Sequence, residues 1–541
     1  MSLCPQRSIP PVPDDTARVA RAAFRRGNPY VLLRDRLGAV FDDAVFADLY
    51  PALGQPAYAP WRLALVTLMQ FREGLSDRQA AEAVRSRIDW TYLLARVLDT
   101  AREGGLLKAR GRQRTDSTHV LAAIRTLNRL ELVGETLRAA LNAVAVVAPD
   151  WLRGVAPLDW HERYDRRVED MRLPETGPKR DAYFVQVGAD GFLLLDALDA
   201  AGAPPDAAAL PEIAVLRQVW ARHFERTEGG PDGSAPQDVQ LRPVQALGPG
   251  ERIESPYDID ARFRTKSDMS WTGYMAHVTE TCDKGAPHLV VHTDTTPANV
   301  HDAMRVEPIH AALAAIASRR SVCEAAGGGA AGGDLAPAEH LVDAAYVSAG
   351  HLVSARERYG IDLVGPPRRD VSWQRQSEDA FGVSDFIVDW ERRRVRCPEG
   401  KESTHWGQYV AKGRGPCVKV GFRRSDCAAC PSQARCTRTQ GHGRRLTLHP
   451  RPEHEALAAA RAREQSEEGQ QLYAQRQGIE GTVSQGVRVF GLRRARYRGL
   501  AKTGLQTVAT AAALNLDRLG AWLATRPLAP TRISRFAALA A

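Results

Sequence analysis

The sequence contains no apolar run long enough to cross a bilayer, so we expect no membrane partner. Its first residues, MSLCPQRSIPPVPDD, lack the apolar core of a signal peptide, and we expect a cytoplasmic protein. Only eight residues are cysteine, and in a reducing compartment their thiols can bind a metal rather than form disulfides. Lysine supplies only 8 of the 73 basic residues, which fits the codon usage of a GC-rich genome.

Positive charge is unevenly distributed along the chain. Residues 371–541 carry 29 Lys and Arg against 15 Asp and Glu, whereas residues 1–370 carry 44 against 49. Codon usage explains the preference for arginine over lysine, but it does not explain this asymmetry. A basic field raises encounter rates with nucleic acid, so we expect the last third of the chain to contact it.

Residues 1–107 are predicted to form a helical domain. Pro60 fits the first position of a helix that runs through WRLALVTLMQF, and Ser76 with Gln79 fits the capping box of the next helix. Two helices across a Gly-containing turn are typical of a DNA-binding helix-turn-helix, and equally of a small helical packing unit.

Residues 108–370 are predicted to form an α/β core with an insertion at about 121–256. Apolar spacing predicts helices through most of 121–224, and the Gly, Pro and Asp content of 225–256 predicts a loop. Strands are predicted around Asp116, at SWTGYMAHVTETCD, at HLVVHTDTTPA, at HLVDAAYV, ending at Asp343, and at IDLVGPP.

The remaining residues are predicted to form two parts. Residues 371–450, rich in Trp, Arg and Cys, look like an inserted basic module, and residues 451–541 look like the C-terminal part of the core. A polar helix is expected over 451–480.

Three acids that are far apart in the sequence stand in suggestive contexts. Asp116 and Asp343 lie in strand-like segments, where a carboxylate points into a crevice rather than into bulk water. Glu480 lies on an expected helix, with Tyr473 and Arg476 at a spacing that places all three on one face. Carboxylates suit Mg²⁺, and three converging acids can hold two divalent metals for phosphodiester chemistry.

Several blocks of the sequence resemble the DDE transposases of bacterial insertion sequences. YPALGQPAYAPWRLALVTLMQFREGLSDRQAAEAVRSRIDW is similar to their InsH-like N-terminal domain, and QRTDSTHVLAAI, ARFRTKSDMSWTGYMAHVTETCD, HLVDAAYVSAG and IEGTVSQGVRVFGLRRARYRGL are similar to parts of their catalytic domain. The resemblance implies a ribonuclease H-like fold in which Asp116, Asp343 and Glu480 are the first, second and third catalytic acids.

The resemblance also implies cofactors and partners. The three acids would hold two Mg²⁺ ions, with Mn²⁺ as a substitute, for phosphoryl transfer. The substrates would be terminal inverted repeats and target DNA, bound by a homodimer at the bacterial nucleoid. The residues that would contact DNA are Tyr473, Arg476, Arg488, Arg493, Arg494, Arg496, Arg498 and Lys502.

Two features depart from the family pattern. Relatives carry a lysine seven residues after the glutamate, where this chain has Val487, so Arg488 takes over its phosphate contact or the contact is missing. The segment 94–107 is shorter than in relatives. Two alternatives to a transposase therefore stay open: a metal-dependent DNA nuclease that cleaves without joining, and an inactive remnant that only binds DNA.

Four cysteines of the module indicate a different kind of metal site. Cys427 and Cys430 form a Cys-x2-Cys pair, and Cys397 and Cys436 stand alone on either side. Four thiolates can hold a structural Zn²⁺ tetrahedrally, where Cys417 or His405 is an alternative to either single cysteine. The other interpretation is a set of reduced thiols. A zinc ion here would stabilise a segment of low apolar content and take no part in catalysis.

Overall fold

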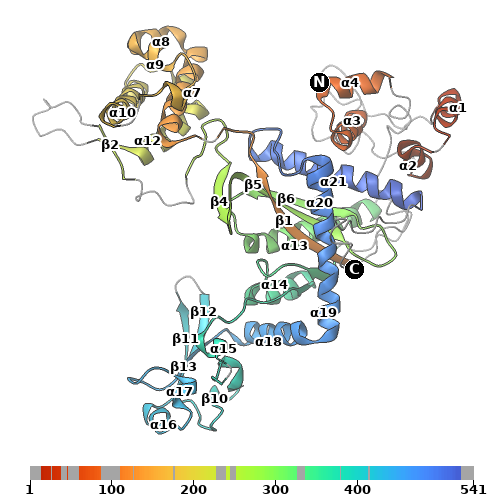
Figure 1. Cartoon of the computed structure of the whole chain (residues 1–541), viewed down its shortest axis with the longest axis vertical. Coiled ribbons are helices and arrows are strands. Elements are labelled where there is room, and N and C mark those ends of the chain that lie inside the picture. Colours follow the sequence, from red (N-terminus) through yellow and green to blue (C-terminus); the bar gives the residue numbers. More distant parts are fainter. Residues whose placement is uncertain are drawn as a thin grey trace, which may run out of the picture.

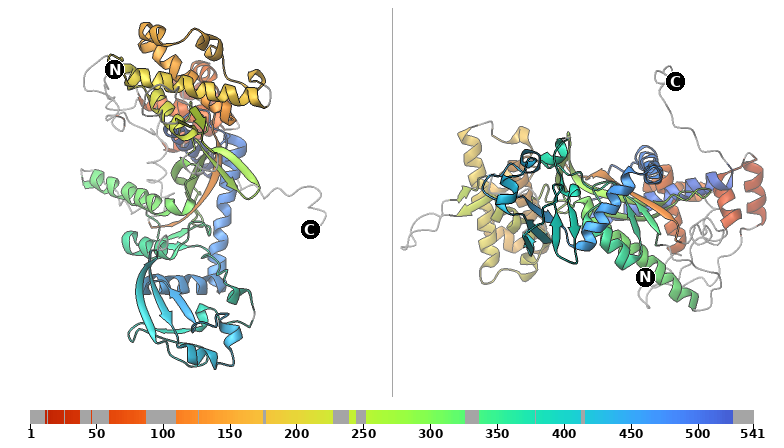
Figure 2. Two further views of the ribbon diagram at one scale, coloured as in Figure 1. Left: turned by 90° about the vertical axis from the view of Figure 1, so that its left-hand side faces the viewer. Right: turned by 90° about the horizontal axis from the view of Figure 1, so that it is seen from below.

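A mixed sheet lies at the centre of the molecule, with three smaller bodies around it (Figure 1). A helical insertion and a small β module lie at opposite ends of the long axis, and the N-terminal helices lie beside the central sheet's helical cover (Figures 1 and 2). Among the residues described, no helix has the length and apolar content needed to cross a membrane. The structure, a computed structural model, describes residues 12, 14–25, 27–37, 46, 60–86, 110–125, 127–174, 177–226, 239–243, 252–325, 336–377, 379–411 and 415–525.

The central sheet places β1 in its middle. One edge of β5 pairs antiparallel with β1, and its other edge pairs antiparallel with β4 and β6. Beyond β1, β7 and β8 follow in parallel, which gives the order β6-β5-β1-β7-β8. The bounds are β1 (Arg112–Leu121), β4 (Arg262–Lys266), β5 (Met269–Thr281), β6 (Val290–Pro297), β7 (Glu339–Leu341) and β8 (Asp362–Val364).

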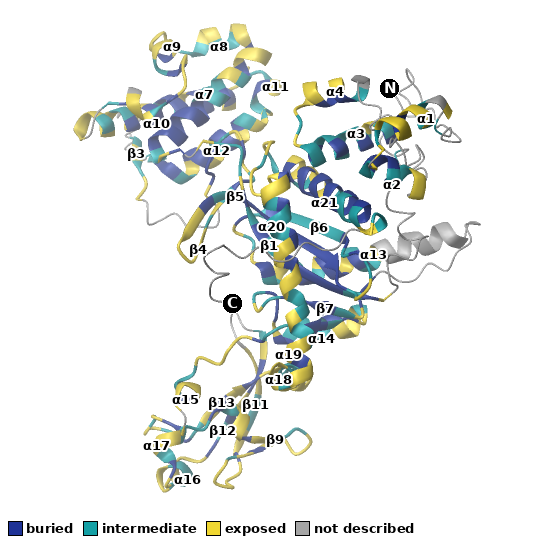
Figure 3. Ribbon diagram, turned by 45° about the vertical axis from the view of Figure 1, so that its right-hand side comes forward, coloured by how far each residue is buried: buried dark blue, intermediate teal, exposed yellow. Residues whose placement is uncertain are grey.

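Helices cover both faces of this sheet and bury it (Figure 3). On one face, α13 (Val306–Ala325) and α14 (Ala349–Tyr359) form an apolar core with β8. On the other face, α20 (Gly478–Phe490) and α21 (Leu500–Leu523) pack through Ile479 and Ala511 against Val278 of β5 and Val290 of β6. The C-terminal segment is therefore part of the central core.

The N-terminal helices pack on α21. Leu516 and Leu519 of α21 join a cluster with side chains of the second and third helices, including Tyr30 and Leu65. The predicted capping box is confirmed, because the Ser76 backbone N–H donates to Gln79 Oε1 at 2.9 Å. The described helices are α1 (Asp14–Ala23), α2 (Pro29–Leu37), α3 (Pro60–Glu73) and α4 (Asp77–Ser86). The segment 94–107 lies outside the described residues.

The insertion after β1 is helical, as predicted for 121–224, and has its own apolar core. The loop predicted for 225–256 contains β3 (Val239–Leu241), which pairs with β2 (Phe224–Arg226). The prediction missed this ribbon because each strand has only three residues. The helices are α7 (Arg129–Val147), α8 (Pro149–Val155), α9 (Asp159–Tyr164), α10 (Pro178–Asp199), α11 (Pro205–Ala208) and α12 (Pro211–His223), with a 3-10 turn η2 (Asp170–Arg172).

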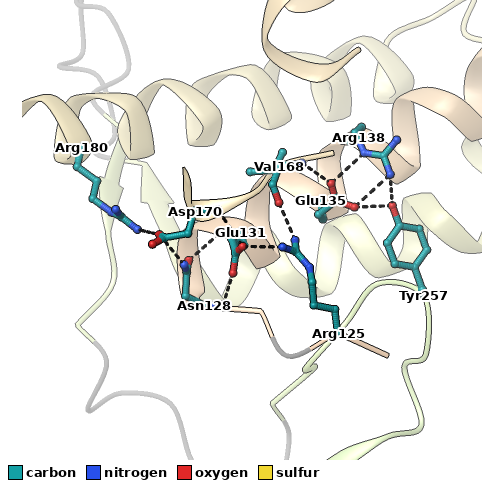
Figure 4. Close-up of polar contacts among 9 residues, drawn as sticks. All are labelled: Arg125, Asn128, Glu131, Glu135, Arg138, Val168, Asp170, Arg180 and Tyr257. Carbon is teal, nitrogen blue, oxygen red and sulfur yellow. Dashed lines mark hydrogen bonds and ion pairs between the residues drawn. The ribbon is translucent and has the colours of Figure 1, made fainter. Parts of the chain in front are cut away.

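Two buried carboxylates on α7 tie the base of the insertion together (Figure 4). Arg125 donates to Glu131 at 3.0 Å, and Arg138 donates to Glu135 at 3.0 Å. The hydroxyl of Tyr257, on the segment that returns to the sheet, donates to Glu135 at 2.7 Å. The network therefore fixes the place where the insertion meets the core.

Residues 371–450 form short strands and turns around a small apolar core. The single polar helix predicted over 451–480 is wrong, because the chain breaks twice. Ser466 ends α18 and caps α19 by accepting the Gly469 N–H, and a 3-10 turn separates α19 from α20. The elements are α15 (Trp373–Gln376), η6 (Val383–Asp385), β9 (Ile387–Asp389), β10 (Arg394–Arg396), β11 (His405–Ala411), β12 (Gly415–Gly421), α16 (Arg424–Ala428), α17 (Gln433–Cys436), β13 (Arg445–Leu448), α18 (Arg451–Gln465), α19 (Glu467–Ala474) and η7 (Gln475–Gln477).

Buried histidines on the α13 face should make the core sensitive to acid. The rings of His310 and His340 are in contact at 2.8 Å between Nε2 and Nδ1, and His277 contacts the Tyr346 hydroxyl at 2.6 Å. Burial lowers the pKa of His277 and of His310 to about 4. An unfolded histidine titrates near ~6.5, so between these values the unfolded chain binds more protons and stability falls as pH falls.

When the pH falls from 7 to 5, the free energy of unfolding should decrease by about 2 kcal/mol for each such histidine. Urea unfolding of the full chain at the two pH values measures this loss. His310→Gln should reduce the pH dependence, whereas His161→Gln, at an exposed position on α9, should leave it unchanged. If the wild type, His310→Gln and His161→Gln lost stability equally as the pH falls, the buried His310 would not be a source of the acid sensitivity.

Candidate metal centre and nucleic-acid surface

Asp116 lies in the middle of β1 on the face that α20 covers. Arg114 and Thr118 are two residues away on either side and share that face, because side chains alternate along a strand. Arg114 donates to the Gln475 carbonyl at 2.5 Å, and Thr118 accepts from Arg493 Nε at 2.9 Å. The face of β1 that carries Asp116 therefore meets both the turn before α20 and the basic segment after it.

Asp343 lies beside Asp116, although the strand predicted to end at Asp343 ends at Leu341. In the parallel pairing of β1 and β7, Arg114 is opposite Leu341. Two residues further along each chain are Asp116 and Asp343, so the register directs both carboxylates to the same edge of the site. Asp343 Oδ1 accepts the Ala345 backbone N–H at 2.9 Å, which fixes the start of the turn that follows.

Glu480 reaches the same place from the first turn of α20, where its side chain is 66% exposed. Arg476, in the 3-10 turn η7, lies 3.1 Å from Asp116 Oδ2 and 3.4 Å from Glu480 Oε1. Tyr473 lies on α19. The prediction that Tyr473, Arg476 and Glu480 share one helix is wrong, since they occupy three successive elements, but Arg476 and Glu480 keep the expected contact.

The charges of the acids act on one another and on Tyr473. Burial raises the pKa of Asp116, the charge of Asp343 raises it further, and Arg476 and the Ser117 backbone N–H oppose the shift. Burial also raises the pKa of Tyr473, with further contributions from Asp343 and Asp116. Asp116 and Glu480 thus contact the Arg476 guanidinium, and Asp343 acts on it through its charge.

This arrangement fits a divalent cation in its chemistry. In the structure, the Arg476 guanidinium pairs with two of the carboxylates, Asp116 and Glu480. The oxygen-only donor set suits Mg²⁺. Within the described ranges, no three His, Cys, Asp or Glu side chains are already placed at metal-binding distance of one another.

A buried carboxylate that the sequence patterns did not indicate, Glu280, positions α20. Glu280 on β5 is fully buried and bonds at 2.6 Å to each of Arg114, Arg518 of α21 and the Thr482 hydroxyl of α20. Arg114 comes close to the start of α20 because residue 478 is glycine. A Cβ at Gly478 would lie 2.1 Å from Arg114 Nη1. The one available signal was a glutamate in an otherwise buried strand.

The predicted basic segment runs along the end of β1. The backbone N–H of Leu121 donates to the Arg493 carbonyl at 2.8 Å, and Arg494 forms a bridge with the same strand residue. The Arg496 guanidinium covers the ring of Phe71 in α3 at 4.8 Å, and Arg498 covers Tyr257 at 5.3 Å. The predicted contact residues on and after α20 are all exposed, namely Arg488, Arg493, Arg494, Arg496, Arg498 and Lys502.

The four predicted cysteines of the module come together around one cavity. Cys397, Cys427, Cys430 and Cys436 all line it. Burial raises the pKa of Cys436 to about 11, and the other three thiols contribute to the increase. Cys417 lies on β12 and does not line this cavity, and neither does His405, so the two single cysteines need no replacement.

Two family models match the chain. Residues 396–520 match a model described as Transposase DDE domain, and residues 19–102 match one described as Transposase domain (DUF772). The first match includes Glu480 and the four cysteines, and the second includes the end of α1 together with α2, α3 and α4. Together they support the predicted resemblance to insertion-sequence DDE transposases. No curated protein and no solved structure matches the chain.

Proposed function

We propose that this chain, which carries two transposase domains, cuts DNA at the ends of an insertion sequence and joins those ends to target DNA. The observation that carries the proposal is that Arg476 pairs with both Asp116 and Glu480, while the charge of Asp343 acts on Asp116. The order of the strands supports a ribonuclease H-like core, in which the insertion at 121–256 and the module at 371–450 interrupt the catalytic fold.

Asp116, Asp343 and Glu480 would hold the divalent metal, Mg²⁺ with Mn²⁺ as a substitute. When bound, two such ions stabilise the attacking and leaving oxygens of an in-line phosphoryl transfer. Water would be the first nucleophile, and the released 3′-hydroxyl would be the second. Arg476, 3.1 Å from Asp116, keeps a positive charge beside the scissile phosphate.

The exposed arginines after α20 would bind the phosphate backbone. Arg493 contacts Thr118, two residues from Asp116 on the same strand, so a duplex on this segment would pass the three acids. Arg498 extends the same surface to the base of the helical insertion. We expect one copy of the chain at each element end, as a homodimer on the DNA of the bacterial nucleoid.

The test is a cleavage and joining assay with the full chain. Its substrates are a labelled duplex carrying the DNA that flanks the gene and a supercoiled plasmid as target, with Mg²⁺ or with EDTA. We expect nicked ends and then labelled plasmid, with Mg²⁺ only. Cleavage without labelled plasmid would indicate a nuclease, and binding without cleavage would indicate a remnant. Either result would overturn the proposal.

A further inference from the structure

The four cysteines of the module are brought together by three separate turns. Cys397 directly follows β10, Cys427 lies in α16 with Cys430 in the turn after it, and Cys436 ends α17. All four line a cavity of about 30 Å³ next to the apolar core of the module. Residues up to 39 positions apart in the sequence thus face one space of roughly the volume of a single ion or water.

The backbone around these cysteines already directs donors at sulfur. The Lys401 N–H donates to Cys397 Sγ at 3.3 Å, and the Arg444 N–H donates to Cys427 Sγ at 3.3 Å. An anionic sulfur accepts such bonds better than a neutral thiol does. Donors of this kind also orient sulfur ligands around a metal.

The cavity has cationic neighbours. Arg444 and Lys401 both line it, and Arg444 Nε is buried without a hydrogen-bond partner. A centre of four thiolates and one divalent ion remains anionic, so the Arg444 guanidinium would offset its charge. Glu399, which also lines the cavity, is engaged by the Ser432 hydroxyl at 2.6 Å.

The described residues of the module enclose a small apolar core. This core contains seven buried hydrophobic residues, and the sulfurs of Cys397, Cys427 and Cys436 pack at the edge of that core. A segment of this size rarely gains more than about 3–5 kcal/mol from its apolar core, and a structural metal is a common supplement. Closed sites of four cysteines are typical of Zn²⁺, which keeps no open position for catalysis.

We propose that Cys397, Cys427, Cys430 and Cys436 bind one structural Zn²⁺ that stabilises the module at the far end of the molecule from the N-terminal helices. The sulfurs surround the cavity, and among the described side chains no three potential ligands have yet converged on one point. We therefore expect the metal to draw the three turns inward. The inference does not depend on the transposase activity.

The test measures zinc in the full chain purified without chelators. We expect about one equivalent in the wild type, and less than about a fifth of that in Cys430→Ser and in Cys436→Ser. Cys417→Ser is the matched control, since Cys417 is a buried thiol of the same module that lies outside the cavity, and this variant should keep its zinc.

A second measurement covers the case in which the serine variants do not fold. The wild-type chain loaded with Co²⁺ should show the strong visible absorption of tetrahedral cobalt together with thiolate-to-metal charge transfer. A wild-type protein that contains no zinc and gives no such spectrum would overturn the proposal. Disulfides among the four cysteines in the freshly purified protein, or equal zinc loss in Cys417→Ser, would overturn it as well.

Discussion

Asp343→Asn should lower the rate of strand cleavage by about a thousandfold or more and leave DNA binding unchanged. A metal ligand at the reacting phosphate contributes several kcal/mol to the transition state, and about 4 kcal/mol corresponds to a factor of ~1000. Asparagine keeps the oxygen that accepts the Ala345 N–H, so the turn after β7 should persist. Single-turnover cleavage in Mg²⁺ measures the rate, and a DNA-binding titration measures the affinity.

Asp116→Asn should reduce cleavage to the same extent. It also removes the charge that Arg476 faces at 3.1 Å, so a modest loss of stability is expected in addition. Asp199→Asn is the control, because Asp199 pairs with Arg217 on the exposed surface of the insertion. Wild-type cleavage by the Asp343 or Asp116 variant would exclude these acids as metal ligands.

Glu280→Gln should destabilise the core by about 3–5 kcal/mol, because it leaves the buried Arg114 and the half-buried Arg518 without their counter-charge. Hydrogen exchange of the β5 amides measures this loss locally, which suits a chain of several domains. Glu391→Gln makes the same chemical change in an exposed pair with Arg451 and should cost less than about 1 kcal/mol.

The cleavage rate of Glu280→Gln reports on the position of α20 rather than on the stability of the sheet. Glu280 touches Thr482, two residues after Glu480 on α20, so its loss should displace that helix and slow cleavage even where the sheet persists. Unchanged exchange in β5 together with unchanged cleavage would show that the four-way contact is dispensable.

The strands of the core could be predicted from the sequence because their apolar pattern is local. Asp116 lies in a strand as predicted, whereas the strand predicted to end at Asp343 ends two residues earlier, at Leu341. The two breaks in the segment 451–480 could not be predicted in this way. They depend on Ser466 as a cap and on the hydrogen bond from Arg114 to the Gln475 carbonyl. The second contact joins residues more than 360 positions apart.

In the site, too, local sequence features could be predicted, whereas positions set by long-range contacts could not. Residue type and motif spacing indicated Arg476 as a phosphate contact, but its position between Asp116 and Glu480 depends on how η7 lies across β1. Glu280 was missed for a related reason. A buried glutamate is costly unless it is paired, and its partners come from three different elements that only the fold brings together.

The central position of β1 has a consequence for synthesis. Its partners β5 and β7 and the helix that carries Glu480 all follow it, the last by more than 360 residues. At roughly 5–20 residues per second, the ribosome adds Glu480 on the order of 20–70 s after Asp116. Until β5 and β7 have been added β1 has unpaired edges, and any product that stops before α20 lacks Glu480. On the proposed mechanism, such a product would not cleave DNA.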